Sequence, residues 1–215
     1  MLRTVTSQFI GLCLVGLALL APFVTAQPQT PRPVVYVIPI EGVIDLGLAP
    51  FVVRVLEDAT QAGAAVVILD IDTFEGRLDA AVQIRDALLN AKVPTVAFVN
   101  KRAISAGALI GRSAQTLVMS TGSTIGAAAP VQAGLPGSAT APTQEKTVSY
   151  VRKEFRATAE ARKRPPLLAE ATVDADVEVP GINLKGKLLT LTTDEALQHK
   201  VGPHMGLRRK LIGAG

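Results

Sequence analysis

One serine in the chain is set among small residues at the point where two apolar runs meet. Ser105 lies within residues 102–108, Arg-Ala-Ile-Ser-Ala-Gly-Ala. Small neighbours allow a substrate backbone to approach the hydroxyl, and the amide of Ala106 is placed to stabilise a developing oxyanion. The pattern is typical of a nucleophile at a strand-to-helix turn. A serine that only caps an alanine-rich helix has the same local sequence, so this segment alone leaves both interpretations open.

A second loop offers another backbone donor. Residues 72–77, Asp-Thr-Phe-Glu-Gly-Arg, follow an apolar strand-like run. The amide of Gly76 is a candidate partner for the same oxyanion, and such a donor contributes about 3 kcal/mol to transition-state stabilisation. A tight turn with a positive φ also requires a glycine, and the two roles are compatible.

The general base for the serine is left open by spacing. Lys146 directly follows residues 131–145, a Gly-, Pro- and Ala-rich stretch typical of a loop that covers a substrate, and it begins a predicted helix that runs to about Arg164. To accept a proton near pH 7, its pKa has to fall by about 3 units through burial. An ordinary exposed lysine fits the spacing better. His199 and His204 lie in the least patterned stretch and are interpreted as surface residues.

The elements that must position these residues follow from the hydrophobic periodicity. Strand-like and helix-like segments alternate along the chain, which predicts parallel strands joined by right-handed crossovers. Active groups in such sheets gather beyond the carboxyl ends of the strands, where the serine and glycine loops both fall. The predicted strands span 34–40, 65–71, 95–99 and 116–119, and the helices span 49–62, 78–90 and 106–114.

The later part of the chain has weaker patterns. Residues 122–126 are predicted to form a turn, and 187–191 a strand. The sequence Thr-Thr-Asp-Glu at 192–195 is a capping box, which predicts a helix through about His199.

Composition limits the class of protein. The chain has 215 residues, of which 48% are hydrophobic, and this favours one α/β domain with an aliphatic core. The net charge of +4 is not arranged as a basic stripe with aromatic residues, so nucleic-acid binding is not indicated. Cys13 is the single cysteine, which excludes an internal disulfide framework and a cysteine metal site. No metal or other cofactor is expected.

Four segments divide the chain. Residues 1–26 have a positive start, an apolar stretch and small residues before Gln27, which predicts a signal peptide and an exported, periplasmic or otherwise extracytoplasmic protein. An uncleaved anchor is the second interpretation. Residues 27–33 form a Pro-rich linker, 34–202 the domain, and 203–215 a basic tail. The tail is interpreted as a frayed end, with contact to an anionic membrane surface as an alternative.

Longer motifs extend the pattern. "VIPIEGVID", "AVVILDIDTFEGRLDAAVQIRDAL", "VPTVAFVNKRAISAGALI" and "GSTIGAAAPV" lie between Val35 and Val131. Together they resemble the N-terminal protease domain of the nodulation-efficiency-D (NfeD) family, which are membrane-bound serine proteases of the ClpP class. The resemblance continues through "EKTVSYVRKEFRATAEAR" and "GKLLTLTTDEAL", so it covers nearly all of the chain after the linker.

The resemblance implies a ClpP/crotonase-like α/β fold with parallel β-α-β units. It also implies a serine-lysine dyad that cuts hydrophobic peptide segments, including the C-terminal part of stomatin-like membrane proteins. On this sequence the nucleophile falls on Ser105 and the general base on Lys146. The oxyanion donors fall on the amides of Gly76 and Ala106. A homodimer whose protomers share an active-site cleft is the family's habit and is expected here.

The chain departs from the family pattern in the glycine loop. It has Glu75 before Gly76 where the family usually has two glycines, and Phe74 and Glu75 are candidates for lining the substrate groove. If the Glu75 carboxylate points inward, it opposes the oxyanion and favours protonated Lys146, and both effects slow hydrolysis. If it faces solvent, neither effect applies.

Two further departures lie elsewhere. Arg112 and Ser113 interrupt a helix that is expected to be apolar. This predicts either altered packing behind Ser105 or an Arg112 head group that extends to the surface. Long members of the family also continue into transmembrane helices and a small β-barrel, whereas this sequence stops at Gly215.

The sequence thus predicts a serine endopeptidase with a Ser105–Lys146 dyad. The alternative is a weak or inactive pseudoprotease that binds a membrane partner in the peptide groove without cutting it, which Glu75 favours. A third interpretation, an acyl-CoA hydratase or isomerase, follows from the shared fold alone.

Overall fold

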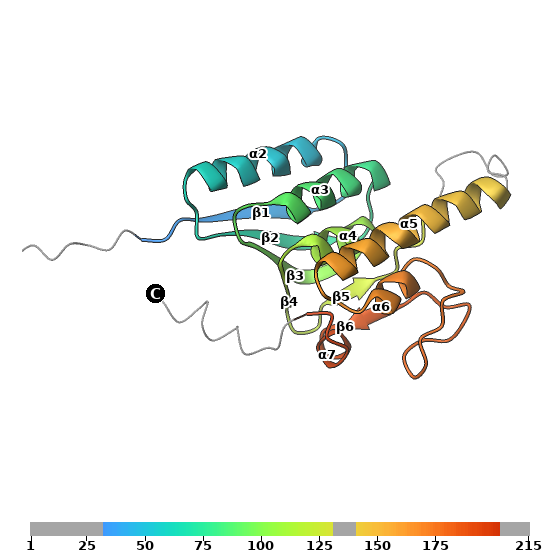
Figure 1. Ribbon diagram of the computed structural model, residues 1–215. Helices are drawn as coiled ribbons and strands as arrows, with labels where there is room; N and C mark the ends of the chain where they lie inside the picture. The colour runs from blue at the N-terminus through green and yellow to red at the C-terminus, as the bar shows by residue number, and fades with distance from the viewer. Residues whose placement is uncertain (1–31, 131–140, 203–215) are drawn as a thin grey trace, which may run out of the picture. The chain divides into compact units, whose positions relative to one another are not determined.

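A computed structural model describes residues 32–130 and 141–202 of the chain (Figure 1). The chain divides into two units, Met1–Arg32 and Pro33–Gly215, and every element below belongs to the second unit. The predicted signal peptide, most of the linker, the tail, and residues 131–140 of the predicted substrate loop lie outside the described residues.

A six-stranded mixed sheet forms the centre of the second unit. The first four strands are parallel, as the periodicity predicts, with β2 between β1 and β3 and with β4 paired to β3. Three helices connect them, and all three lie on one face of this part of the sheet (Figure 1). The elements are β1 (Val35–Glu41), α2 (Leu48–Gln61), β2 (Val66–Thr73), α3 (Leu78–Asn90), β3 (Thr95–Ile104), α4 (Ala106–Ser113) and β4 (Thr116–Met119).

The turn predicted at 122–126 is confirmed only at its first residue, since the turn lies at residues 121–122. Residues Thr124–Gly126 form strand β5, which is parallel to the last residues of β3, because β3 runs on to Ile104 and offers its edge. The predicted strand at 187–191 is also displaced, since strand β6 spans Thr190–Thr192 and is antiparallel to β5. Leu189 is engaged elsewhere, because its amide donates to Ala171 and its carbonyl accepts from Ala127.

The helical region after the predicted substrate loop begins earlier than expected. Helix α5 spans Ala141–Ala161, so residues 141–145 are helical and not part of a loop. Pro142 fits there because the first turn of a helix needs no backbone donor. A short helix α6, Pro166–Ala171, follows where the prolines predict only a stop.

The predicted capping box is confirmed. Helix α7 spans Thr193–Gln198 and begins after Thr192. The Thr192 amide donates to the Glu195 carboxylate at 2.9 Å, and the Glu195 amide donates to the Thr192 hydroxyl at 3.4 Å.

The core is aliphatic and lies between the sheet and the three helices. Every second residue of β1 and β2 faces the helices, and most of these are fully buried, including Ile38, Ile40, Leu69 and Ile71. Burial of such side chains contributes roughly 1.5–3 kcal/mol each, so this layer is the main source of stability for the elements that carry the serine and glycine loops.

Arg112 is an exception inside this core. All eight residues of α4 are buried, and Arg112 is 0% exposed, so the prediction that its head group reaches the surface is wrong. None of its three guanidinium nitrogens has a hydrogen-bond partner among the described residues. Arg164 lies close by and donates to the Arg112 carbonyl at 2.6 Å. Burial, and secondly the charge of Arg164, lowers the pKa of Arg112 to about 10.

Replacing Arg112 by methionine is expected to stabilise the fold. A buried cation without a partner is unfavourable, and an apolar side chain of similar volume removes that cost. We expect Arg112→Met to raise the free energy of unfolding by about 1–3 kcal/mol at pH 7, measured by urea denaturation. The matched control is Arg54→Met, because Arg54 is an exposed arginine on α2.

The gain in the free energy of unfolding that Arg112→Met produces depends on pH. Burial lowers the pKa of Arg112 in the folded chain to about 10, below its value in the unfolded chain. Above pH 10 the unfolded chain therefore binds more protons, and the cost of burying the cation declines. The stability gap between Arg112→Met and the unsubstituted chain therefore narrows above about pH 10. A loss of stability in Arg112→Met at pH 7 would contradict the unpaired state of this group.

Candidate active site

Ser105 occupies a strained turn between β3 and α4. It is the N-cap of α4 and has φ 55° and ψ −121°, a conformation that costs a non-glycine residue about 1–3 kcal/mol. Two backbone hydrogen bonds hold it there: its amide donates to the Gly126 carbonyl at 3.1 Å, and its carbonyl accepts from Ala108 at 3.0 Å. Across residues 32–130 and 141–202, no group forms a hydrogen bond with its hydroxyl. Strain of this kind presents a side chain at the tip of a turn, as a nucleophile requires.

Gly76 is held beside the end of β1. The Ile44 amide donates to the Glu75 carbonyl at 3.2 Å, and the Arg77 amide donates to the Ile44 carbonyl at 2.8 Å. A Cβ atom on Gly76 would lie 2.5 Å from Ile44 Cβ, which is too close for any side chain. Gly76 is not among the glycines with positive φ. The interpretation that its turn needs a positive φ is therefore wrong, and the glycine is required by the close approach of Ile44.

Thr73 connects the glycine loop to the serine helix. Its hydroxyl is buried and donates to the carbonyls of Gly42 and Glu75. A Cβ atom on Gly107 would lie 2.4 Å from Thr73 Cγ2, so the first turn of α4 packs directly on the end of β2. The two loops are thereby brought to the same edge of the sheet.

The two predicted oxyanion donors open onto one pocket with the serine. Ser105, Gly76 and Ala106 all line a cavity of about 380 Å³. Neither the Gly76 nor the Ala106 amide donates a backbone hydrogen bond within the described ranges. The first amides of a helix have no partner inside the helix, and the helix dipole favours negative charge there. This arrangement can stabilise an anion that develops next to Ser105.

The pocket is largely apolar and adjoins two other hollows. A second hollow of about 510 Å³ shares Arg77 and Leu78 with it, and a third of about 390 Å³ shares Ala129. The three hollows therefore lie next to one another on the surface. The remaining residues that line the central pocket are Val43, Glu75, Ala81, Leu109, Ala128, Pro130, Thr147, Val151 and Phe155.

The two groove candidates lie differently. Glu75 is exposed and is among the residues that line the pocket. Phe74 is 65% exposed and is not among them. The carboxylate of Glu75 has no ion-pair partner among the residues that the structure describes.

The structure does not bring Lys146 to Ser105. The Lys146 side chain is exposed on the second turn of α5, whereas Thr147, Val151 and Phe155 of the same helix line the pocket. Lys146 therefore lies next to the wall of the pocket, and its pairing with Ser105 stays a prediction.

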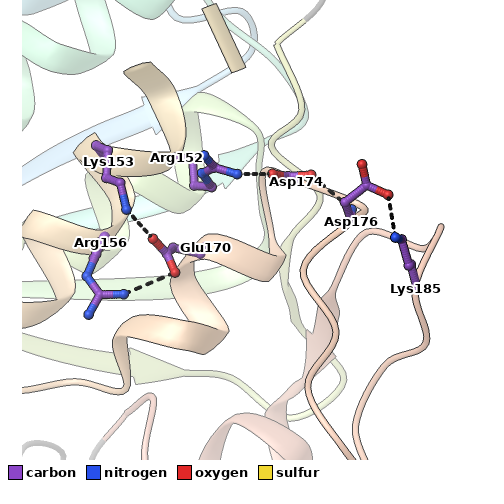
Figure 2. A network of polar contacts seen from close by, with 7 residues as sticks. All are labelled: Arg152, Lys153, Arg156, Glu170, Asp174, Asp176 and Lys185. Carbon is purple, nitrogen blue, oxygen red and sulfur yellow. Dashed lines mark hydrogen bonds and ion pairs between the residues drawn. The ribbon is translucent and has the colours of Figure 1, made fainter. Parts of the chain in front are cut away.

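Ion pairs join the later part of α5 to α6 and to the segment that follows it (Figure 2). Glu170 of α6 is 6% exposed and accepts hydrogen bonds from Lys153 at 3.0 Å and Arg156 at 3.1 Å. Arg152 pairs with Asp174, just after α6. The contacts position the pocket wall that α5 supplies. They were not predicted, although the basic residues of α5 were a signal that an acidic partner would be needed.

Side chains of α5 also contact α3. Arg85 forms an ion pair with Glu154 at 3.3 Å and donates to the Thr158 hydroxyl at 2.9 Å.

Within the described part of the chain, no helix has the length and apolar character needed to cross a bilayer.

Comparison with known proteins places this site in a family context. The model of the NfeD1b N-terminal domain matches residues 34–205. The membrane protein NfeD1b of Bacillus subtilis is 38% identical over 174 residues, which are 80% of this chain. The membrane-bound protease PH1510 of Pyrococcus horikoshii is 27% identical over 179 residues, or 82% of this chain. The match spans only 38% of the length of either relative.

Solved structures give the same relationship. A serine-to-alanine mutant of 1510-N, a membrane-bound stomatin-specific protease, superposes with a TM-score of 0.67 at 26% identity, covering 80% of this chain and 79% of the other. A lysine-to-alanine mutant of 1510-N in complex with a substrate peptide has the same TM-score at 27% identity, covering 80% and 75%. ClpP1 of Listeria monocytogenes, at 15% identity and a TM-score of 0.56 over 77% of this chain and 88% of its own, supports the predicted fold. The chain belongs to the NfeD1b family, and residues 34–205 correspond to its N-terminal domain.

Proposed function

We propose that this protein is a serine endopeptidase that cuts hydrophobic peptide segments. The observation that carries the proposal is Ser105 itself, held at positive φ in an apolar pocket beside two amides that donate no hydrogen bond to the described residues. Distant similarity to a membrane-bound protease adds support, since 1510-N has been solved as a serine mutant and as a lysine mutant with a substrate peptide.

The proposed reaction uses Ser105 and Lys146 as a dyad. The neutral Lys146 amine accepts the Ser105 proton while the Ser105 oxygen attacks the peptide carbonyl carbon. The amides of Gly76 and Ala106 stabilise the resulting oxyanion. When the C–N bond breaks, Lys146 returns the proton to the leaving amine, and an ester remains on Ser105. A water molecule that is deprotonated by Lys146 then hydrolyses the ester and restores both side chains.

Lys146 has to turn inward for this reaction. Its side chain is exposed, and burial beside the pocket is what would favour the neutral amine. Thr147, the next residue, already lines the pocket wall, so Lys146 lies next to the site. We infer that a bound peptide supplies the burial that this lysine needs.

The substrate class follows from the pocket lining. Leu109, Val151 and Phe155 offer an apolar surface that suits an apolar peptide side chain. Because the related 1510-N is specific for stomatin, a stomatin-like membrane protein is the proposed partner. The proposal also includes export of the protein from the cytoplasm and formation of a homodimer. The relatives NfeD1b and PH1510 are membrane proteins.

Removing either member of the dyad is expected to abolish cleavage. Ser105→Ala and Lys146→Ala should each lower kcat/KM for a hydrophobic peptide by at least about 10³-fold, because dyad members act as a unit. The measurement is cleavage of a hydrophobic peptide panel by the full chain, followed by mass spectrometry. Lys187→Ala is the matched control, since Lys187 is an exposed lysine away from the pocket. Equal activity of Lys146→Ala and Lys187→Ala would remove Lys146 from the mechanism.

Glu75 is expected to slow the reaction. A carboxylate at the pocket rim opposes the oxyanion by roughly 1 kcal/mol in a solvated site, so Glu75→Gly should raise kcat about fivefold. Glu75→Gln removes the charge without adding the backbone freedom of a glycine. A similar gain in kcat in both variants would assign the effect to the charge. If neither variant gains, Glu75 does not act as a brake.

A binding role without cleavage is the second candidate. It is favoured by the exposed position of Lys146 and by Glu75 at the rim of the pocket. Labelling with a fluorophosphonate distinguishes the two functions. A protease should be labelled at Ser105 and lose the label in Ser105→Ala, whereas a folded chain that binds the peptide and resists the label is a pseudoprotease.

A further inference from the structure

One face of the sheet has no covering layer among the described elements. Helices α2, α3 and α4 all lie on the opposite face (Figure 1). Most strand residues that point away from these helices are apolar and none is buried, with Val35 at 46% and Val37 at 60% exposure. The apolar residues of this open face are Val35, Val37, Pro39, Val66, Ile68, Val96, Phe98 and Val118.

These residues form a continuous surface across four strands. Val37 of β1, Ile68 of β2 and Val96 of β3 are neighbours in register. In the next row, Phe98 of β3 pairs with Val118 of β4. A contiguous apolar surface of this kind marks an interaction site.

An acidic group without a partner lies within the open face. Asp70 sits in register between Pro39 and Phe98. Its Oδ1 atom is buried and accepts no hydrogen bond from the described part of the chain. By contrast, Asp72 two residues along the strand pairs with Arg102 at 2.9 Å and Lys101 at 3.4 Å. A buried carboxylate oxygen without a donor is costly, so whatever covers this face should deliver a cation to Asp70.

The chain continues from the edge of this sheet, beside β4. Gly202 is so close to β4 that a Cβ atom on it would lie 2.8 Å from the Leu117 carbonyl oxygen. Residues 207–212, Leu-Arg-Arg-Lys-Leu-Ile, follow in the sequence and combine apolar side chains with three cations. From β4 to β2 is about 10 Å, or two strand spacings. Six to eight residues beyond Gly202 reach roughly 20–28 Å when extended, so the basic run can reach Asp70.

We propose that residues 207–212 pack across the open face, with the basic run donating a hydrogen bond to Asp70. Charge and apolar character match on both sides: the face has apolar rows around one unpaired carboxylate, and the segment has apolar residues around three cations. This contact is independent of peptidase activity.

Limited trypsin digestion of the full native chain tests the contact. Trypsin cuts after the three residues of the basic run, and docking on Asp70 shields those bonds. We expect Asp70→Asn to raise the cleavage rate in the run about tenfold, the effect of losing one charge-assisted hydrogen bond. Asp58→Asn is the matched control, because Asp58 is an exposed aspartate on α2, on the other side of the sheet. Its cleavage rate should equal that of the unsubstituted chain. Equal rates in all three chains would overturn the proposal.

A photo-crosslinker at Phe98 identifies the occupant directly. Phe98→p-benzoylphenylalanine in the full chain should form an adduct with residues 203–215 of the same molecule, read by mass spectrometry. An adduct with a second molecule, with lipid in added anionic vesicles, or with no peptide at all would each overturn the assignment. The adduct should decline in the double variant that also carries Asp70→Asn.

Discussion

The contact between Gly107 and Thr73 is the constraint on which the site depends. It leaves no room for a side chain at position 107 in the first turn of α4, so the helix packs directly on the end of β2. Thr73 also holds the loop of Gly76 through the carbonyls of Gly42 and Glu75. One threonine thus sets the position of both amides that face the pocket. Their spacing is fixed by steric contact and backbone hydrogen bonds, which are stiffer than contacts between long side chains.

The strain at Ser105 is maintained by elements that are distant in sequence. Its amide is bound by Gly126, and β5 is held in turn by β6. Gly126 itself allows Leu189 to approach, since a Cβ atom there would lie 2.4 Å from the Leu189 carbonyl oxygen. Strands β5 and β6 therefore support the serine turn from distant parts of the sequence.

Ion pairs hold the later part of helix α5. Its residues from Arg152 onward are held by Glu170, Asp174 and α3, and they place Val151 and Phe155 at the pocket. Lys146 lies a turn and a half before these ion pairs and is exposed. Two buried charged side chains near this helix differ in their pairing. The Glu170 carboxylate accepts hydrogen bonds from two cations, whereas the Arg112 guanidinium has no partner among the described residues.

Local periodicity by itself determined the parallel strands, the helices between them, the capping box at Thr192 and the place of Ser105 at a strand-to-helix turn, because these depend on residues adjacent in sequence. Strands β5 and β6 were missed or displaced, since three residues are too few to show a period. Only the tertiary structure decided that Arg112 is buried, that Lys146 is exposed and that Gly76 is a glycine because of Ile44. Burial and close approach are set by what packs from distant parts of the chain, and no local pattern records them.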